Sequence, residues 1–171
     1  LPGHHLALSL AIENDALPNF RRFGGPTAYH EGWGLYAETL GEDLGLYQTP
    51  YREFGRLSFD AWRASRLVID TGIHWYGWTR EQSVAFLLAH TALTETDAIA
   101  EVERYIAIPA QALSYKIGQR KLLELRARAE RALGPGFNVR AFHSAVLNDG
   151  AMPLSILEQK IDRWIADERT P

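Results

Sequence analysis

No stretch of this chain alternates apolar and polar residues with the period of two that a half-buried β-strand shows, and no Asn-Gly hairpin turn is present. Apolar segments are instead bounded by helix-capping residues, proline and glycine. In residues 50–74, for example, we expect Leu57, Trp62, Leu67 and Ile69 to be among the buried side chains of one helix. The pattern therefore predicts an all-α protein.

Helix boundaries are marked clearly along the chain. Residues 79–82, Thr-Arg-Glu-Gln, have the form of a capping box, and Pro2 suits the first turn of a helix. Residues 15–27 hold two prolines and two adjacent glycines, which predicts a loop. The predicted helices cover residues 2–14, 28–44, 50–74, 79–90, 94–108, 109–133, 138–148 and 153–166. We expect an array of about eight helices, mostly antiparallel neighbours with short loops, forming a single helical domain over residues 1–171.

Composition narrows the class of protein. The 171 residues are 46% hydrophobic and 23% charged, which is ordinary for a globular domain with a hydrophobic core. The formal net charge of -3 argues against a nucleic-acid-binding protein, and no apolar run approaches the length of a membrane span. The absence of cysteine excludes disulfides and thiolate zinc sites. Nothing in the sequence indicates a cellular compartment.

Two segments near the N-terminus carry residues that could take part in chemistry. Adjacent histidines on a helix point about 100° apart, so only one of His4 and His5 would bind a given metal, and a structural or exposed role is the alternative. Glu31 and Glu38 are seven residues apart and share one helix face. Between them, Gly32 and Gly34 indicate close packing against another backbone or access for a ligand. The alternative is an ordinary helix contact with solvated glutamates.

The pair His30-Glu31 is half of a zinc-binding His-Glu-x-x-His motif, but position 34 is glycine, so the motif is incomplete. Further along, four polar residues at spacings of three, four and four form a stripe on one helix face: Arg63, Arg66, Asp70 and His74. Their apolar flanks favour a partly buried network over a salt-bridged surface. In residues 111–119, the Tyr115 hydroxyl or the Lys116 ammonium is of the type that binds a carboxylate or stabilises an oxyanion.

These segments together resemble the bacterial family known as domain of unknown function 885. The matching strings are PGHHL at 2–6, EGWGLYAE at 31–38, RASRLVIDTGIH at 63–74, QALSYKIGQ at 111–119 and GAMPLSILE at 150–158. They cover nearly the whole chain. The resemblance implies the C-terminal portion of a larger helical, zinc-metallopeptidase-like fold. Leu1 also lacks a preceding initiator Met and a charged leader, which indicates a truncated, processed or excised chain.

The resemblance also implies roles for individual residues. His4 would be the second histidine ligand of a zinc ion and Glu31 the carboxylate ligand, while a His-Glu pair upstream of Leu1 would supply the first ligand and the general base. Tyr115 would donate to the oxyanion, and His74 would support the ligands or act as another donor. Arg66 and Lys116 would orient a substrate carboxylate. The family usually has Gln where this chain has Ala7, which puts any contact of that Gln in doubt.

We therefore expect the C-terminal part of a zinc-dependent peptidase or amide hydrolase that uses metal-activated water on a peptide or small amide. The isolated chain is expected to bind zinc weakly and to be inactive. The alternative is a catalytically inactive helical binding or structural module that keeps an inherited groove. A hydrolase with another nucleophile is disfavoured because no Gly-x-Ser-x-Gly motif and no cysteine are present. The expected partners are the upstream segment or a second copy of the chain.

Overall fold

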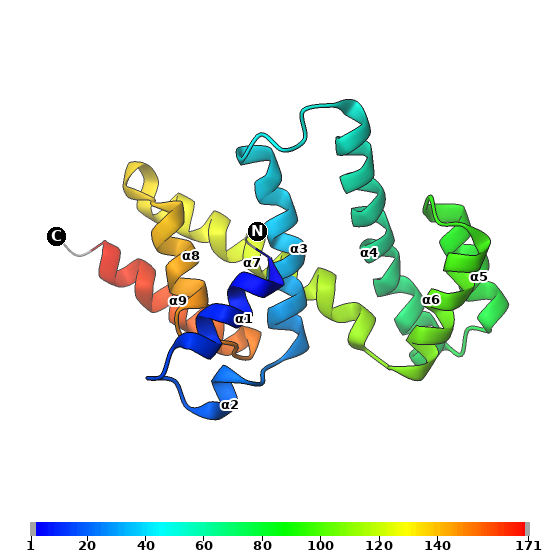
Figure 1. The fold of residues 1–171 in the computed structure, drawn as a ribbon, viewed down its shortest axis with the longest axis horizontal. Helices are drawn as coiled ribbons and strands as arrows, with labels where there is room; N and C mark the ends of the chain where they lie inside the picture. The colour runs from blue at the N-terminus through cyan, green and yellow to red at the C-terminus, as the bar shows by residue number, and fades with distance from the viewer. Residues whose placement is uncertain (1–2, 170–171) are drawn as a thin grey trace. The chain divides into compact units, whose positions relative to one another are not determined.

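The computed structural model describes residues 3–169, and every regular element in that range is helical (Figure 1). All eight predicted helices are present, with ends that agree to within two residues. The predicted loop 15–27 contains one further short helix, α2, and Pro2 lies outside the described residues. The elements are α1 (His4–Glu13), α2 (Asn19–Arg22), α3 (Thr27–Asp43), α4 (Pro50–Tyr76), α5 (Arg80–His90), α6 (Glu95–Ala107), α7 (Gln111–Leu133), the 3-10 turn η1 (Gly134–Gly136), α8 (Val139–Leu147) and α9 (Leu154–Glu168).

Local hydrogen bonds explain where the helices begin. The Thr79 hydroxyl accepts from the Gln82 amide at 3.2 Å, and the Gln82 side chain accepts from the Thr79 amide at 2.8 Å, so the predicted capping box is confirmed. The side chains of Thr94 and Asn138 likewise accept from amides in the first turns of α6 and α8, without a reciprocal bond. These side chains accept hydrogen bonds from amides that have no partner within the helix. For this reason the start of each helix can be predicted from the sequence.

The chain divides into two compact units. Unit 1 comprises Leu1–Ala37 and Ile117–Pro171, and unit 2 comprises Glu38–Lys116. Helices α3 and α7 each contribute to both units. The single domain expected from the sequence stays a prediction.

Unit 1 is organised around aromatic and aliphatic side chains of α3, α7, α8 and α9. Trp33, Tyr36 and Phe142 are fully buried, together with Leu122, Leu125, Leu157 and Ile161. The Tyr29 hydroxyl donates to the Val146 carbonyl at 2.8 Å, and burial raises the pKa of this tyrosine. Residues 29, 33 and 36 are spaced so that they lie on one face of α3, and this face packs in the core of unit 1.

Unit 2 has its own core, in which α5 and α6 pack against α4 (Figure 1). Its buried members are Ile69, Leu87, Ala98, Val102, Tyr105 and Ala112. Ile69 was expected there, whereas the prediction that Leu57 is buried is wrong, because it lies in an open hollow beside the end of α5 and is 49% exposed. Helical spacing identifies a face of α4 but not how completely neighbouring helices cover it.

No helix within residues 3–169 is both long enough and apolar enough to cross a bilayer, in agreement with the prediction of no membrane span.

Candidate functional site

The structure brings the two predicted metal ligands of unit 1 into direct contact. His4 begins α1 and Glu31 lies near the start of α3, and the His4 Nε2 atom is 2.7 Å from Glu31 Oε2. The His4 side chain is 47% exposed and that of Glu31 is 18% exposed, so the pair lies at the surface with the carboxylate more enclosed. Of the two adjacent histidines, it is therefore His4 that meets Glu31.

Glycine at position 34 is what allows this contact. A Cβ there would lie 2.1 Å from His4 Cε1 and 2.4 Å from His4 Nε2, so any side chain would displace the imidazole. Glu31 and Gly34 are three residues apart and lie on the same face of α3, away from the buried Trp33. One face of the helix is thus anchored in the core while the next receives the His4 ring.

Gly32 has a different role from Gly34. A Cβ at Gly32 would lie 2.5 Å from Gly118 Cα, and one at Gly118 would lie 2.0 Å from the Ala28 carbonyl oxygen. The backbones of α3 and α7 therefore cross in contact at these two glycines. Of the two expectations for these glycines, close packing against another backbone is confirmed at Gly32, whereas Gly34 makes room for the His4 side chain.

His30, the neighbour of Glu31, points into unit 1. Burial, and then the charge of His4, lower the pKa of His30, and its Nδ1 atom is buried without a hydrogen-bond partner among residues 3–169. Within residues 3–169 no group of three His, Asp or Glu side chains is arranged to hold a metal ion.

The predicted site residues of unit 2 lie along the polar stripe of α4 and at the start of α7. Arg66 is enclosed by the rings of Trp62, Tyr105 and Tyr115, with its Cζ atom 4.7, 5.6 and 4.6 Å from their centroids. Its Nη2 atom is 3.1 Å from Glu101 Oε2, and its Nε atom donates to the Tyr105 hydroxyl at 3.0 Å. The side chain is 5% exposed, and Nη1 is buried without a hydrogen-bond partner in the part of the chain that the structure describes.

The rest of the stripe is tied to the connection between α6 and α7. Both carboxylate oxygens of Asp70 accept from the Ala110 amide, at 3.2 and 3.1 Å, and His74 Nε2 is 3.0 Å from the Tyr105 carbonyl oxygen. Asp70 is almost fully buried, and burial raises the pKa of its carboxyl group. The prediction that the stripe forms a partly buried network is confirmed.

Lys116 and Tyr115 have separate surroundings in unit 2. The Lys116 ammonium lies 2.5 Å from Asp60 Oδ1. The Tyr115 hydroxyl makes no hydrogen bond within the described residues, and its ring face meets Arg66. The partners Glu101 and Asp60 were not predicted, because nothing in the sequence links them to residues 35 and 56 positions away. The roles assigned to Arg66, His74, Tyr115 and Lys116 stay predictions.

Comparisons with known proteins identify the family. The family described as "bacterial protein of unknown function (DUF885)" matches residues 1–161. A solved structure from Colwellia psychrerythraea, described as a "putative lipoprotein", matches 97% of this chain with 42% sequence identity and a TM-score of 0.95. The present chain spans 28% of that protein's chain. No match was found among curated proteins. From the extent of the family match, this chain belongs to the bacterial DUF885 family.

Proposed function

We propose that this chain forms part of a metal-dependent hydrolase that cleaves a peptide or related amide bond with metal-activated water. The observation that carries the proposal is the approach of His4 Nε2 to Glu31 Oε2, at 2.7 Å, from two different helices. A histidine nitrogen and a carboxylate oxygen held this close together are a ligand pair that one ion can bind.

The chemistry of the two donors fits zinc. Imidazole nitrogen and carboxylate oxygen are both common zinc ligands, and a catalytic zinc usually has three protein ligands and an open position for water. His4 and Glu31 supply two, so the proposal assigns the remaining ligand to a part of the protein outside residues 3–169. The bound metal would lower the pKa of a water molecule and polarise the substrate carbonyl.

The side chains of unit 2 are proposed to act on the substrate. Two donors support this: the Tyr115 hydroxyl makes no hydrogen bond within residues 3–169, and Arg66 has one buried N–H without an acceptor. The hydroxyl of Tyr115 is suited to donate to an oxyanion. Arg66, Lys116 and His74 already have protein partners, so a substrate would share or displace these.

The test is the metal content of the longest gene product that contains this sequence, measured by elemental analysis beside the chain 1–171. We expect close to one zinc per protein in the longer product and little in the chain alone. The variants Glu31→Gln and His4→Asn should each lose the metal, because each removes one ligand while keeping the size of the side chain. Glu13→Gln, which changes an exposed carboxylate on α1, is the matched control and should retain it.

Retention of stoichiometric metal by both site variants would contradict the ligand assignment. An absence of metal from every form, with no chelator-sensitive cleavage of peptides, would instead support the helical binding or structural module.

A further inference from the structure

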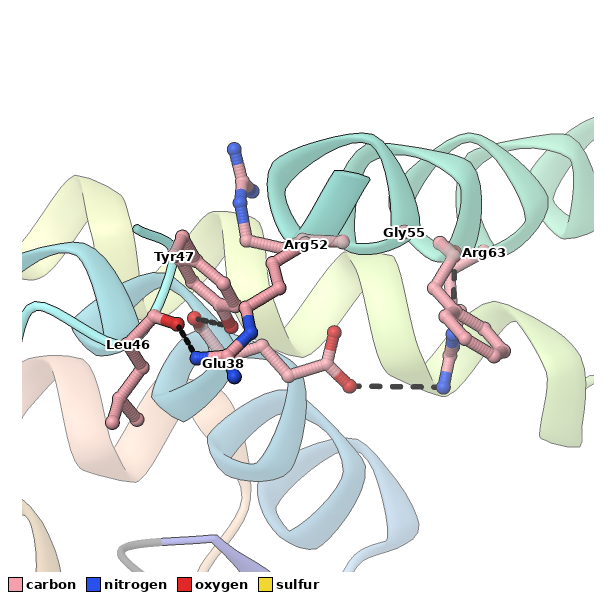
Figure 2. A pocket seen from close by; sticks show the side chains of 8 residues that line it. Glu38, Leu46, Tyr47, Arg52, Gly55 and Arg63 are labelled. Atoms are coloured by element: carbon pink, nitrogen blue, oxygen red, sulfur yellow. Dashed lines mark hydrogen bonds and ion pairs between the residues drawn. The ribbon is translucent and has the colours of Figure 1, made fainter. Parts of the chain in front are cut away.

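The members of the polar stripe on α4 have different surroundings. Arg63 and Gly55 line a cavity of about 600 Å³ that opens in unit 2 beside the end of α3 and the loop that follows it (Figure 2). At its edge, Nη2 of Arg63 faces Glu38 Oε1 at 3.7 Å (Figure 2). Asp70 and His74 lie outside this lining and hold a different segment of the chain.

Asp70 and His74 both bind the backbone where α6 ends and α7 begins. His74 Nε2 is 3.0 Å from the Tyr105 carbonyl oxygen, and both carboxylate oxygens of Asp70 accept from the Ala110 amide, at 3.2 and 3.1 Å. Asp70 is only 2% exposed, and burying a carboxylate costs free energy unless it is hydrogen-bonded. The proposed hydrolase assigns no role to Asp70, so its burial needs a reason of its own.

The segment that Asp70 binds is a tight turn with an unusual backbone conformation. The Gln111 amide donates to the Ile108 carbonyl oxygen at 3.4 Å. Pro109 and Ala110 are therefore the two central residues of the turn. Ala110 has a φ of 66°, and within residues 3–169 it is the one residue other than glycine with a positive φ. Glycine or asparagine normally takes this place in a turn, because a Cβ atom is crowded there.

An alternative conformation of this turn would give Ala110 an unstrained, negative φ. The two conformations differ by a rotation of the peptide group between Pro109 and Ala110, which reverses the direction of the Ala110 N–H. In the alternative, α7 could begin near Pro109, as the sequence predicts, because proline suits the first turn of a helix. The structure begins α7 at Gln111 instead. Because the hydrogen bond to Asp70 needs the observed direction of the N–H, this carboxylate favours the strained turn.

The first turns of α7 carry two contacts back to α4. The Tyr115 ring centroid is 4.6 Å from the Cζ atom of Arg66, and the Lys116 ammonium is 2.5 Å from Asp60 Oδ1. Tyr115 follows Ala110 by little more than one helical turn. The conformation of the turn at Ala110 therefore influences where the Tyr115 ring lies.

We propose that Asp70 is a positioning residue for Tyr115. Its carboxylate holds Ala110 in the left-handed conformation, and this turn fixes the start of α7 with the Tyr115 ring against Arg66. The inference rests on the proposed function for what the Tyr115 hydroxyl does to a substrate. The positioning involves no metal, so it can be measured in the chain 1–171 apart from any hydrolysis.

Two NMR signals of the chain 1–171 report on the two parts of the proposal. A positive φ at Ala110 gives a strong nuclear Overhauser effect between its amide and α protons, and a negative φ gives a weaker one. The Arg66 Nε–H resonance, assigned by its loss in Arg66→Lys, carries the ring-current shift of Tyr115, and Tyr115→Leu gives its value without that ring. In Asp70→Ala, we expect the Overhauser effect at Ala110 to weaken and the Arg66 resonance to move toward the Tyr115→Leu value.

Two further variants separate positioning from stability. Asp70→Asn loses the charge but keeps an acceptor oxygen, so both signals should stay near those of the wild type. Asp70→Ala combined with Ala110→Gly should restore both signals, because glycine adopts a positive φ without a steric cost. The unfolding equilibrium constant of this double variant should still exceed that of Ala110→Gly alone by at least about fivefold, since the buried amide at position 110 lacks an acceptor.

Wild-type signals in Asp70→Ala would overturn the proposal and leave Asp70 a residue that only stabilises the fold. A change at Ala110 that leaves the Arg66 resonance in place would also overturn it, as would signals that Ala110→Gly fails to restore. If Asp70→Ala does not fold, Ala110→Val decides, because it keeps the carboxylate but disfavours a positive φ. It should move the Arg66 resonance as Tyr115→Leu does, and an unmoved resonance would contradict the proposal. Zinc content of the longer gene product tests the proposed hydrolase separately.

Discussion

At the scale of single residues, three glycines of this chain differ in whether neighbouring atoms leave room for a side chain. Gly34 is required because the His4 ring occupies the space where a side chain would begin, and Gly32 because α7 crosses there. Gly55 has no such neighbour and borders an open cavity. The sequence shows only that each is a helix-weakening residue, since the distinction depends on what stands opposite each Cα atom.

A matched pair of substitutions tests this difference. Gly55→Ala should stabilise the chain by about 0.5–1 kcal/mol, because alanine is the better helix former and meets no neighbour. Gly34→Ala should be destabilising or neutral, since an overpacking cost of about 1–3 kcal/mol offsets the same propensity gain. Urea unfolding of the two variants gives both values. A stabilisation by Gly34→Ala equal to that by Gly55→Ala would contradict the placement of His4.

The buried carboxylate of Asp70 gives a second residue-scale prediction. Asp70→Ala leaves the Ala110 amide without an acceptor and should cost about 1–3 kcal/mol, whereas Asp70→Asn keeps an acceptor oxygen and should cost less. Burial raises the pKa of Asp70 in the folded state, so the folded chain holds this proton more tightly than the unfolded chain. The protonated Asp70 carboxyl group therefore contributes to the stability of the folded chain below the ordinary aspartate pKa. This contribution is lost as the pH rises through the pKa that Asp70 has in the folded state.

The measurement is urea unfolding of the wild type and Asp70→Asn across the acidic range. The free energy of unfolding of the wild type, relative to that of Asp70→Asn, should fall as pH rises through this window. A difference that rises with pH would show that the carboxylate is stabilised rather than destabilised by its surroundings.

At the scale of elements, α7 and α9 of unit 1 are joined by a surface network centred on Arg128. Its guanidinium pairs with Glu124, Glu158 and Asp162 at 2.6, 2.5 and 2.7 Å. These hydrogen bonds raise the pKa of Arg128, which stays charged at every accessible pH. Because the partners remain partly exposed, solvent and salt screen the interaction.

We therefore expect Arg128→Ala to destabilise the chain by about 1 kcal/mol or less at low salt, as is usual for exposed ion pairs. The effect should shrink at about 1 M NaCl, where the screening length is about 3 Å. Thermal unfolding at both salt concentrations, with Arg120→Ala as the control, checks this. A loss that is large and independent of salt would indicate a packing role for the side chain instead.

At the scale of the whole molecule, the described chain exposes apolar side chains that an isolated globular protein would usually bury. Leu6, Leu8, Leu10 and Ile12 of α1 are all exposed, and the residues that this helix buries are Ala7 and Ala11. Large apolar side chains gathered on one helix are normally covered by other protein surface.

The chain 1–171 alone is accordingly expected to self-associate. Leu6 and Leu10 lie one turn apart on the same face of α1, so Leu6→Glu combined with Leu10→Glu should shift the molecules toward monomer. Sedimentation velocity over a range of concentrations measures the change. A wild type that remains monomeric at every concentration would contradict the expectation.

The sequence by itself determined the helical class, the helix ends and, through the family resemblance, the pair His4 and Glu31. Helix ends can be predicted from the sequence because a capping side chain accepts hydrogen bonds from amides only a few residues away, as at Thr79 and Asn138. Only the tertiary structure decided that Arg66 pairs with Glu101, that Lys116 meets Asp60 and that Leu57 is exposed. These outcomes depend on which helices pack together across tens of residues, and no local preference of the backbone encodes that.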